Sequence, residues 1–230
     1  MKVVTPGITI LKRYGKYANA CWILEAGGEA AIVEMPMISP DEHPPWLRAE
    51  SYARRRHLHV KYALLSHGHV DHCKTLPQFR RQFPETNFVA HRSMVEDRQF
   101  LAIMARNSAL PFEDWVSGRY RIFDTLFDGP LWSGTLGGEP LHIIYAPKHS
   151  YTDVLILFRG AMITGDWFLG DLRDCNALVR PNHKIEAIQR ATQVVSELGY
   201  HVHMLFSAHG DSLFYDVDFY AMMERSQVAH

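Results

Sequence analysis

Short apolar runs separated by turn residues dominate the pattern of this chain. Two of the runs, 21–24 and 30–33, flank Gly27-Gly28, and this arrangement predicts a β-hairpin. Segment 36–45 contains four prolines and is therefore predicted to be a loop. The remaining apolar runs predict strands at 8–11, 61–65, 87–90, 141–145, 154–158, 161–164 and 203–206.

Apolar residues at helical spacing predict helices between these strands. Pro77 suits only the first turn of a helix, and Ser93 with Glu96 three residues later indicates a capping box. Gly199 is typical of a helix C-terminus. The predicted helices cover 47–58, 73–83, 93–104, 185–198 and 217–223. Because helices and strands alternate without an internal repeat or a linker, we expect one layered α/β domain over residues 1–230.

The sequence His-Gly-His-Val-Asp-His at 67–72 directly follows a predicted strand and brings four metal-ligand side chains together. Alternate residues of an extended segment point the same way, so His67 and His69 can bind one ion together. Asp71 lies further along, and His72 faces the other side. A single ion takes about four such ligands, so this cluster fits better as parts of two neighbouring sites. The alternative is a polar loop in a protein with 14 histidines, but a buried strand leading straight into the cluster favours metal binding.

Two neighbouring ions require further ligands downstream, and three residues meet this requirement. His149, Asp166 and His209 each follow a predicted strand and stand beside a small residue or close to a proline. The carboxyl ends of strands are where open α/β sheets commonly place their chemistry. Taken alone, each signal is weak, because a lone histidine after a strand is more often a surface residue and Gly-Asp is more often a turn. In order, and with the first cluster, they predict a metal site.

This ordered set resembles the metallo-β-lactamase superfamily, whose hallmark is His-x-His-x-Asp-His followed by a histidine, a bridging aspartate and a last histidine. The gaps here are 77, 17 and 43 residues (72 to 149, 149 to 166 and 166 to 209). The resemblance implies an α/β fold, a four-layer αβ/βα sandwich with the metals at one edge. It also implies that His67, His69 and His149 hold one ion, that Asp71, His72 and His209 hold the second, and that Asp166 bridges them. Asp71 is in addition the candidate catalytic residue.

Two divalent ions sharing a water lower its pKa towards ~7, which makes a bridging hydroxide available at neutral pH. We therefore expect a dinuclear hydrolase that cleaves an ester, thioester, lactone or phosphodiester of a small molecule. The nitrogen and oxygen ligands suit Zn best, and they also accept Fe or Mn. The alternative is an iron-dependent oxidoreductase of the same fold, similar to persulfide dioxygenases or to diiron oxygen-reactive proteins. The diiron type usually has Glu at the position of His69, which argues against it. A non-catalytic sensor is a third class, and the complete ligand set argues against that.

Two positions depart from the family pattern. Lys148 stands where Gly is common, and Glu34 stands where the early strand usually ends in Asp. Lys148 is either a solvated lysine or a cation that holds an anionic substrate group. With Tyr151 and Arg173 it forms our set of candidate substrate-binding residues. Segments 106–130 and 167–176 are the candidate pocket walls, although core packing and a salt-bridged loop are the commoner explanations.

Composition adds limits on partners and location. The chain has 24 basic and 25 acidic residues, so its charge predicts neither a nucleic-acid nor a membrane partner. Three widely spaced cysteines do not make a disulfide framework and favour a reducing compartment. The first residues lack an apolar core of signal-peptide length, and no apolar run is long enough to span a bilayer. A cytoplasmic protein is expected.

Overall fold

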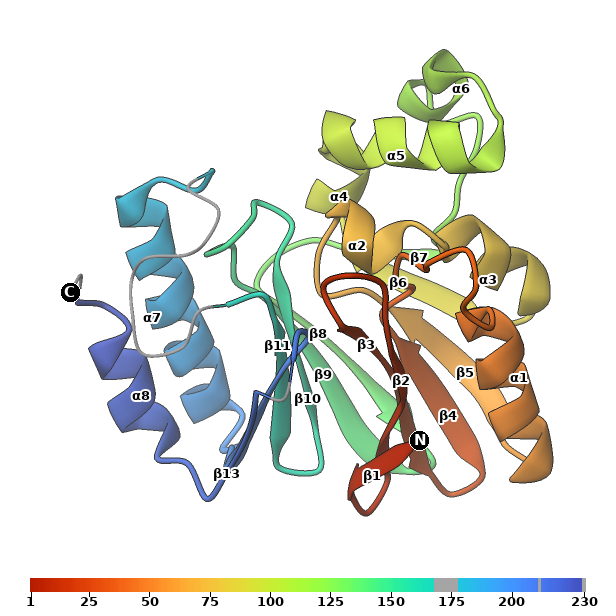
Figure 1. Cartoon of the computed structure of the whole chain (residues 1–230). Helices are drawn as coiled ribbons and strands as arrows, with labels where there is room; N and C mark the ends of the chain where they lie inside the picture. The colour runs from red at the N-terminus through yellow and green to blue at the C-terminus, as the bar shows by residue number, and fades with distance from the viewer. Residues whose placement is uncertain (168–177, 211, 229–230) are drawn as a thin grey trace.

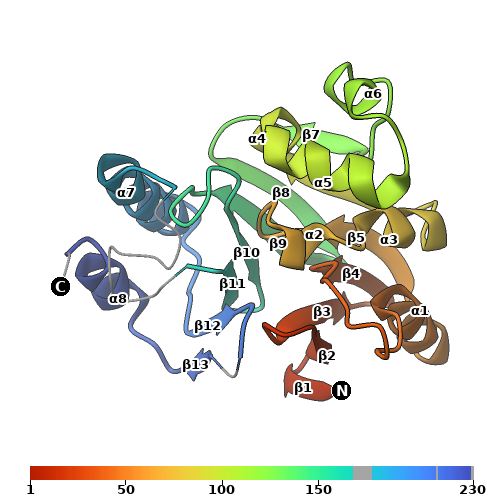
Figure 2. The same ribbon diagram turned by 45° about the horizontal axis from the view of Figure 1, so that its top comes forward.

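Two β-sheets packed face to face form the centre of the molecule, and helices cover both outer faces (Figure 1; Figure 2). The computed structural model describes residues 1–167, 178–210 and 212–228. The order of layers is helix, sheet, sheet, helix, so the prediction of a four-layer α/β sandwich is confirmed.

The first sheet contains seven of the described strands in the order of the chain. Its first half, up to β4, is antiparallel, and its second half, from β4 to β7, is parallel. The strands are β1 (Lys2–Thr5), β2 (Ile8–Tyr14), β3 (Asn19–Ala26), β4 (Glu29–Val33), β5 (His59–Leu64), β6 (Asn87–His91) and β7 (Thr125–Phe127). The hairpin predicted around Gly27-Gly28 is the β3–β4 pair.

The second sheet has the order β13-β12-β11-β10-β9-β8 among the described strands. Only β11 and β12 pair in parallel, and β9 is antiparallel to β10, which is antiparallel to β11. Strands β9, β11 and β12 therefore end at the same edge of the sheet. The strands are β8 (Leu131–Leu136), β9 (Glu139–Tyr145), β10 (Val154–Phe158), β11 (Ala161–Gly165), β12 (Met204–Ser207) and β13 (Leu213–Tyr215).

Helices pack on the outer face of each sheet (Figure 2). On the first sheet lie α1 (Pro45–Arg55), α2 (Val70–Cys73), α3 (Leu76–Gln82), α4 (Ser93–Glu96), α5 (Arg98–Ser108) and α6 (Phe112–Val116). On the second sheet lie α7 (Pro181–Glu197) and α8 (Phe219–Arg225). None of the helices in the described part of the chain is long and apolar enough to cross a bilayer.

Alternation along β3 shows how one strand joins two cores. Cys21 and Ile23 face the helices on the first sheet, whereas Trp22 and Leu24 face the second sheet. The ring of Trp22 stacks on Phe206 of β12 with ring centroids 5.9 Å apart. Burial of each such large apolar side chain stabilises the fold by roughly 1.5–3 kcal/mol. This packing fixes the two sheets relative to each other, and with them the strand ends that carry the predicted ligands.

Four short strands, β1, β7, β8 and β13, were not predicted. Strand β8 has the sequence Leu-Trp-Ser-Gly-Thr-Leu and is largely only half-buried, so its apolar pattern is weak. Strands β1 and β13 occupy sheet edges and have no fully buried residue. Edge strands with mixed exposure lack the continuous apolar run that the other strands show.

Two predicted helices have different bounds in the structure. The helix predicted at 73–83 begins only at Leu76, as α3, because Pro77 has no N–H to continue a helix and occupies the first turn of a new one, whereas α2 lies mostly before the predicted segment and ends at Cys73. Segment 93–104 breaks at Asp97, whose side chain accepts hydrogen bonds from the N–H groups of Gln99 and Phe100 at the start of α5. Ser93 is therefore not the N-cap of a long helix. Its hydroxyl lies 2.9 Å from Nδ1 of His91.

Candidate metal centre

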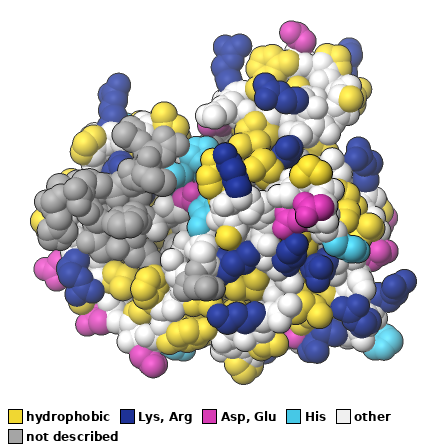
Figure 3. Space-filling model, in the orientation of Figure 1, with side chains coloured by type: hydrophobic (Ala, Val, Ile, Leu, Met, Phe, Trp, Pro, Cys, Tyr) yellow, Lys and Arg dark blue, Asp and Glu magenta, His cyan; other side chains and the backbone are white. Residues whose placement is uncertain are grey.

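Four strand ends from the two sheets meet at one edge of the sandwich. Strand β5 leads into His67, and the ends of β9, β11 and β12 lead into the three downstream residues. Gly165 makes the close approach of the sheets achievable, because a Cβ at this position would lie 2.6 Å from Oγ of Ser66. Figure 3 shows histidine and acidic side chains together at the surface between the two halves of the molecule. All seven predicted ligands are at this edge: His67, His69, Asp71, His72, His149, Asp166 and His209.

Three of these side chains form a three-histidine group. Nε2 of His67 lies 3.0 Å from Nδ1 of His69, and Nε2 of His149 lies 3.1 Å from the same atom. His67 and His149 are buried, and His69 is half-buried. One nitrogen from each ring therefore faces a common point.

The other four side chains form a carboxylate group, made of Asp71, His72, Asp166 and His209, whose ligand atoms lie within 4.8 Å of one another. Nε2 of His72 is 3.1 Å from Oδ1 of Asp166 and 3.5 Å from Oδ2 of Asp71. Nε2 of His209 is 3.1 Å from Oδ1 of Asp166 and 3.3 Å from Oδ2 of Asp71. Two imidazoles thus alternate with two carboxylates.

Asp166 is the residue at which the two groups meet. Its Oδ2 lies 3.7 Å from Nε2 of His149 and 4.0 Å from Nε2 of His67. The same oxygen lies 3.2 Å from Nε2 of His209. One carboxylate therefore faces nitrogen atoms from both the three-histidine group and the carboxylate group.

The buried atoms of this centre fit a divalent cation. Both ring nitrogens of His72 and Oδ1 of Asp166 are buried without a partner at hydrogen-bond geometry among the described residues. Buried polar atoms without partners are costly, and atoms at these distances that do not align on one another can align on an ion between them. Nitrogen from imidazole and oxygen from carboxylate are the donors that Zn, Mn and Fe accept.

Titration behaviour differs between the two groups. Burial lowers the pKa of His67 well below its ordinary value, and the nearby charge of His72 lowers it further, so His67 is neutral and ready to bind metal. Burial also lowers the pKa of His209, but hydrogen bonds to Asp166 and Asp71 outweigh it and raise that pKa to about 9. For Asp71, burial raises the pKa, but the hydrogen bond from His209 and the charge of His72 together outweigh burial and lower the pKa overall. Without metal, the carboxylate group therefore holds protons that an ion must displace.

Glu34 contacts His72 on the side of the ring that faces away from the centre. It directly follows β4, its backbone φ is +69°, and its carboxylate lies 3.3 Å from Nδ1 of His72. Burial lowers the pKa of His72, but the charges of Glu34 and Asp166 outweigh burial and raise it overall. A carboxylate on Nδ1 leaves Nε2 free to face the centre.

A buried carboxylate organises the loop that carries His149. Oδ2 of Asp153 accepts hydrogen bonds from the backbone N–H groups of Lys148, His149 and Ser150, at 2.6–3.0 Å. Burial raises the pKa of Asp153 to about 7, against the effect of these hydrogen bonds. In the same loop, Oγ1 of Thr152 accepts the N–H of Gly68 at 2.9 Å. The loop of His149 is thereby tied to the loop of His67.

The candidate substrate-binding residues have different environments. Tyr151 is exposed beside His149, and its hydroxyl lies 3.4 Å from Nδ1 of His183. Lys148 is fully buried, with Nζ 5.7 Å from the ring centre of Trp167, so it is not the solvated lysine that the simpler explanation required. Arg173 lies outside the described residues. A role of these residues in substrate binding remains a prediction.

Segment 106–130, predicted as a pocket wall, does line a cavity of about 480 Å³. Its walls include Phe100, Trp115 and Phe123. None of the seven candidate ligands lines this cavity, so the lining residues give no connection between the cavity and the candidate metal centre. Most of the other predicted wall, 167–176, lies outside the described residues.

The sequence profile of the Metallo-beta-lactamase superfamily matches residues 15–185, which is most of the chain. The chain belongs to the metallo-beta-lactamase superfamily. The resemblance inferred from the ligand motifs is thereby confirmed. A search of the curated proteins finds no match.

Solved structures of this superfamily share the fold. The BLEG-1 B3 metallo-beta-lactamase has a TM-score of 0.60 at 18% identity, covering 90% of this chain and 93% of that one. The metallo-beta-lactamase from Pontibacter korlensis has a TM-score of 0.66 at 15% identity, covering 99% and 95%. The rubredoxin oxygen:oxidoreductase from Desulfovibrio gigas has a TM-score of 0.66 at 10% identity, covering 98% of this chain and 60% of that one. At these identities the likeness establishes the fold alone.

Sequence reasoning identified the side chains that meet at the centre but not most of the groups that hold them. Glu34 is recognisable in the sequence as a departure from the family pattern, but the sequence does not indicate its contact with His72. Asn19, Thr152 and Asp153 were not singled out at all. Each of them holds a neighbouring segment by side-chain hydrogen bonds to its backbone, and no periodicity or spacing in the sequence indicates such a contact.

Proposed function

We propose that this protein is a dinuclear metal-dependent hydrolase that cleaves an ester, thioester, lactone or phosphodiester of a small molecule. The observation that supports this most directly is the position of Asp166, whose carboxylate faces nitrogens of both ligand groups. Membership of the metallo-beta-lactamase superfamily adds independent support.

In this proposal the three-histidine group holds one ion, and Asp71, His72 and His209 hold the second, with Asp166 between them. Zn fits the donors best, and Fe and Mn also fit. Two ions of this kind lower the pKa of bound water and polarise a carbonyl or phosphoryl oxygen of the substrate.

The chain itself supplies orientation. The carboxylate of Glu34 lies 3.3 Å from Nδ1 of His72, and the backbone carbonyl of Tyr17 accepts from Nδ1 of His209, so that Nε2 of each ring faces the centre. Asp71, the candidate catalytic residue, has a lowered pKa and stays ionised at neutral pH. Its carboxylate can accept a hydrogen bond from the attacking water and orient it.

The test compares metal-loaded wild type with a double variant, His67→Ala with Asp166→Ala, on panels of thioesters, lactones, esters and phosphodiesters. We expect wild type reloaded with Zn, Mn or Fe to turn over at least one class, and the double variant to lose at least about 10³-fold in kcat/KM. The matched control, His43→Ala with Asp41→Ala, removes one exposed histidine and one exposed aspartate from a loop and should keep full activity. Turnover by the metal-free double variant at the wild-type rate would contradict the proposal.

An iron-dependent oxidoreductase is the second candidate. It is supported by the fold shared with the rubredoxin oxygen:oxidoreductase and by a ligand set that accepts iron. Elemental analysis of protein purified without added metal separates the two functions. Iron together with substrate-dependent oxygen consumption would favour the oxidoreductase, whereas zinc without oxygen consumption favours the hydrolase.

A further inference from the structure

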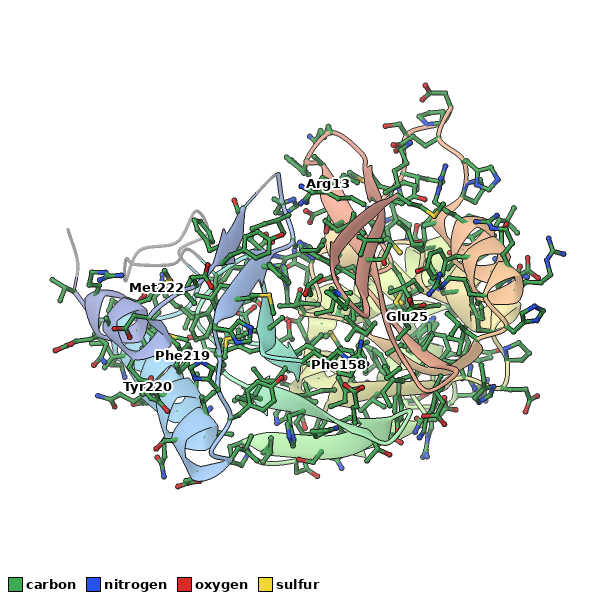
Figure 4. The ribbon with its side chains drawn as sticks, turned by 90° about the horizontal axis from the view of Figure 1, so that it is seen from below. Arg13, Glu25, Phe158, Phe219, Tyr220 and Met222 are labelled. Carbon is green, nitrogen blue, oxygen red and sulfur yellow. The ribbon has the colours of Figure 1, made fainter. Side chains whose placement is uncertain are left out.

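The turn between β2 and β3 reaches the candidate metal centre from one side. We define the hairpin tip as residues 13–20. Its Ala20 N–H donates to the carbonyl of Ala208 at 2.9 Å, and Nη1 of Arg13 donates to the same carbonyl at 3.1 Å. Figure 4 shows Arg13 on the side of this hairpin that faces the second sheet. The tip therefore binds the segment that carries His209.

Asn19 of the hairpin tip connects it to Asp71. The side chain is 1% exposed, and Nδ2 donates to the backbone carbonyl of Asp71 at 3.0 Å. The same carbonyl accepts the N–H of Met37, also at 3.0 Å. Asn19 also forms an isolated β-bridge with His209, whose Nδ1 donates to the carbonyl of Tyr17 at 2.8 Å. Two ligands of the carboxylate group are thus held by the same short turn.

The three-histidine group is supported by other parts of the chain. Gly68 donates to Thr152, and Asp153 accepts the N–H of His149. Oγ of Ser66 lies 3.0 Å from Nδ1 of His67. Among the described residues, no hydrogen bond joins the hairpin tip to His67, His69 or His149. The two groups therefore have separate supports.

We propose that Asn19 is a positioning residue that acts selectively on the second metal ion. This proposal rests on the proposed two-ion function. Without the amide donor, the carbonyl of Asp71 keeps only its bond from Met37, and the backbone before His72 gains freedom. Mutation of a residue that orients a metal ligand typically lowers metal affinity by about 10- to 100-fold. Because no hydrogen bond from the tip reaches the three-histidine group, the first ion should be unaffected.

The test is titration of metal-free protein with Co²⁺ alone at fixed pH, with bound metal counted by equilibrium dialysis and followed by the visible absorption of the bound cobalt. We expect wild type to bind two ions. In Asn19→Ala, affinity for the second ion should fall by about 10- to 100-fold, while the first ion binds within about twofold of wild type. Only the absorption that appears with the second equivalent should be lost. Asn19→Leu removes the donor while filling the same space, and gives the same comparison if the alanine variant does not fold.

Two further variants test the selectivity. Thr152→Val removes the acceptor of the Gly68 N–H and should weaken the first ion instead. Asn107→Ala is the matched control, because it removes an amide that donates to a backbone carbonyl, that of Ile103 in α5, at 2.7 Å, and both ions should then bind as in wild type. Equal weakening of both ions in Asn19→Ala, or unchanged binding of both, would overturn the proposal. A wild-type protein that binds fewer than two ions would instead contradict the proposed function, before any variant is compared.

Discussion

Nδ1 of His72 lies 3.3 Å from the carboxylate of Glu34, and neither side chain has exposed surface. Burying a carboxylate is costly unless a group of opposite charge lies beside it, and the His72 imidazole lies in that position. The contact fixes the ring so that Nε2 faces Asp166. We therefore expect the carboxyl group of Glu34 to affect the affinity for any ion that His72 holds, although it lies on the far side of the imidazole.

Replacing Glu34 tests this support directly. We expect Glu34→Gln to lower affinity for the ion of the carboxylate group by about 10- to 100-fold, because the neutral amide makes the His72 ring a weaker ligand and holds it less firmly. Competition with a chelator of known affinity measures the change. Glu34→Asp keeps the charge on a shorter side chain, so its metal affinity should lie between those of wild type and Glu34→Gln. If Glu34→Gln binds both ions as wild type does, the contact only fills space.

Metal binding to the carboxylate group should depend on pH. Burial lowers the pKa of His209, but its hydrogen bonds to Asp166 and Asp71 raise it to about 9 overall. An ion that binds below this pH must displace the proton. Affinity should therefore rise by up to about tenfold per pH unit towards pH 9 and then level off. Calorimetry at pH 7 in buffers of different ionisation enthalpy should detect release of a proton, and a binding constant independent of pH would contradict the assignment.

Stability of the metal-free protein should show the opposite trend with pH. The pKa of His209 is about 9 in the folded chain and near 6.5 in an unfolded one. Protonated His209 therefore stabilises the folded chain, and this contribution to the free energy of unfolding is present in full below pH 6.5 and is lost as pH rises through 9. We expect the Tm of metal-free protein to fall over this interval. His209→Gln should have a smaller slope than wild type, and equal slopes would show that another group is responsible.

Asp153 should be important for stability as well as for the position of His149. In Asp153→Asn the amide oxygen can take the place of Oδ2 but is a weaker, uncharged acceptor for the three backbone N–H groups, and the new NH2 group faces the hydroxyl of Ser150, which now donates to Oδ1. Hydrogen bonds to a charged group contribute ~1.5–3 kcal/mol each, roughly twice as much as neutral ones, so the free energy of unfolding should fall by ~2–4 kcal/mol. Urea denaturation measures this change. The exposed Asp41→Asn is the matched control and should stay within ~0.5 kcal/mol of wild type.

Sequence alone determined the core strands and the identity of the side chains at the centre. Segments such as 154–158 and 204–206 are continuous apolar runs, and buried strands require that pattern whatever their neighbours are. The side chains that meet at the centre could be predicted because three imidazoles and a carboxylate lie within six residues directly after one strand, and because the order of the later residues matches a known family.

Tertiary structure decided what holds those side chains. Asn19 and Asp71 are 52 residues apart, and Thr152 and Gly68 are 84 apart, so nothing local indicates that they touch. The short edge strands and the break at Asp97 were also set by context, since their propensities are weak and a neighbouring cap or sheet edge outweighs them. Local pattern records burial and ligand chemistry, whereas a single hydrogen bond between distant loops leaves no trace in it.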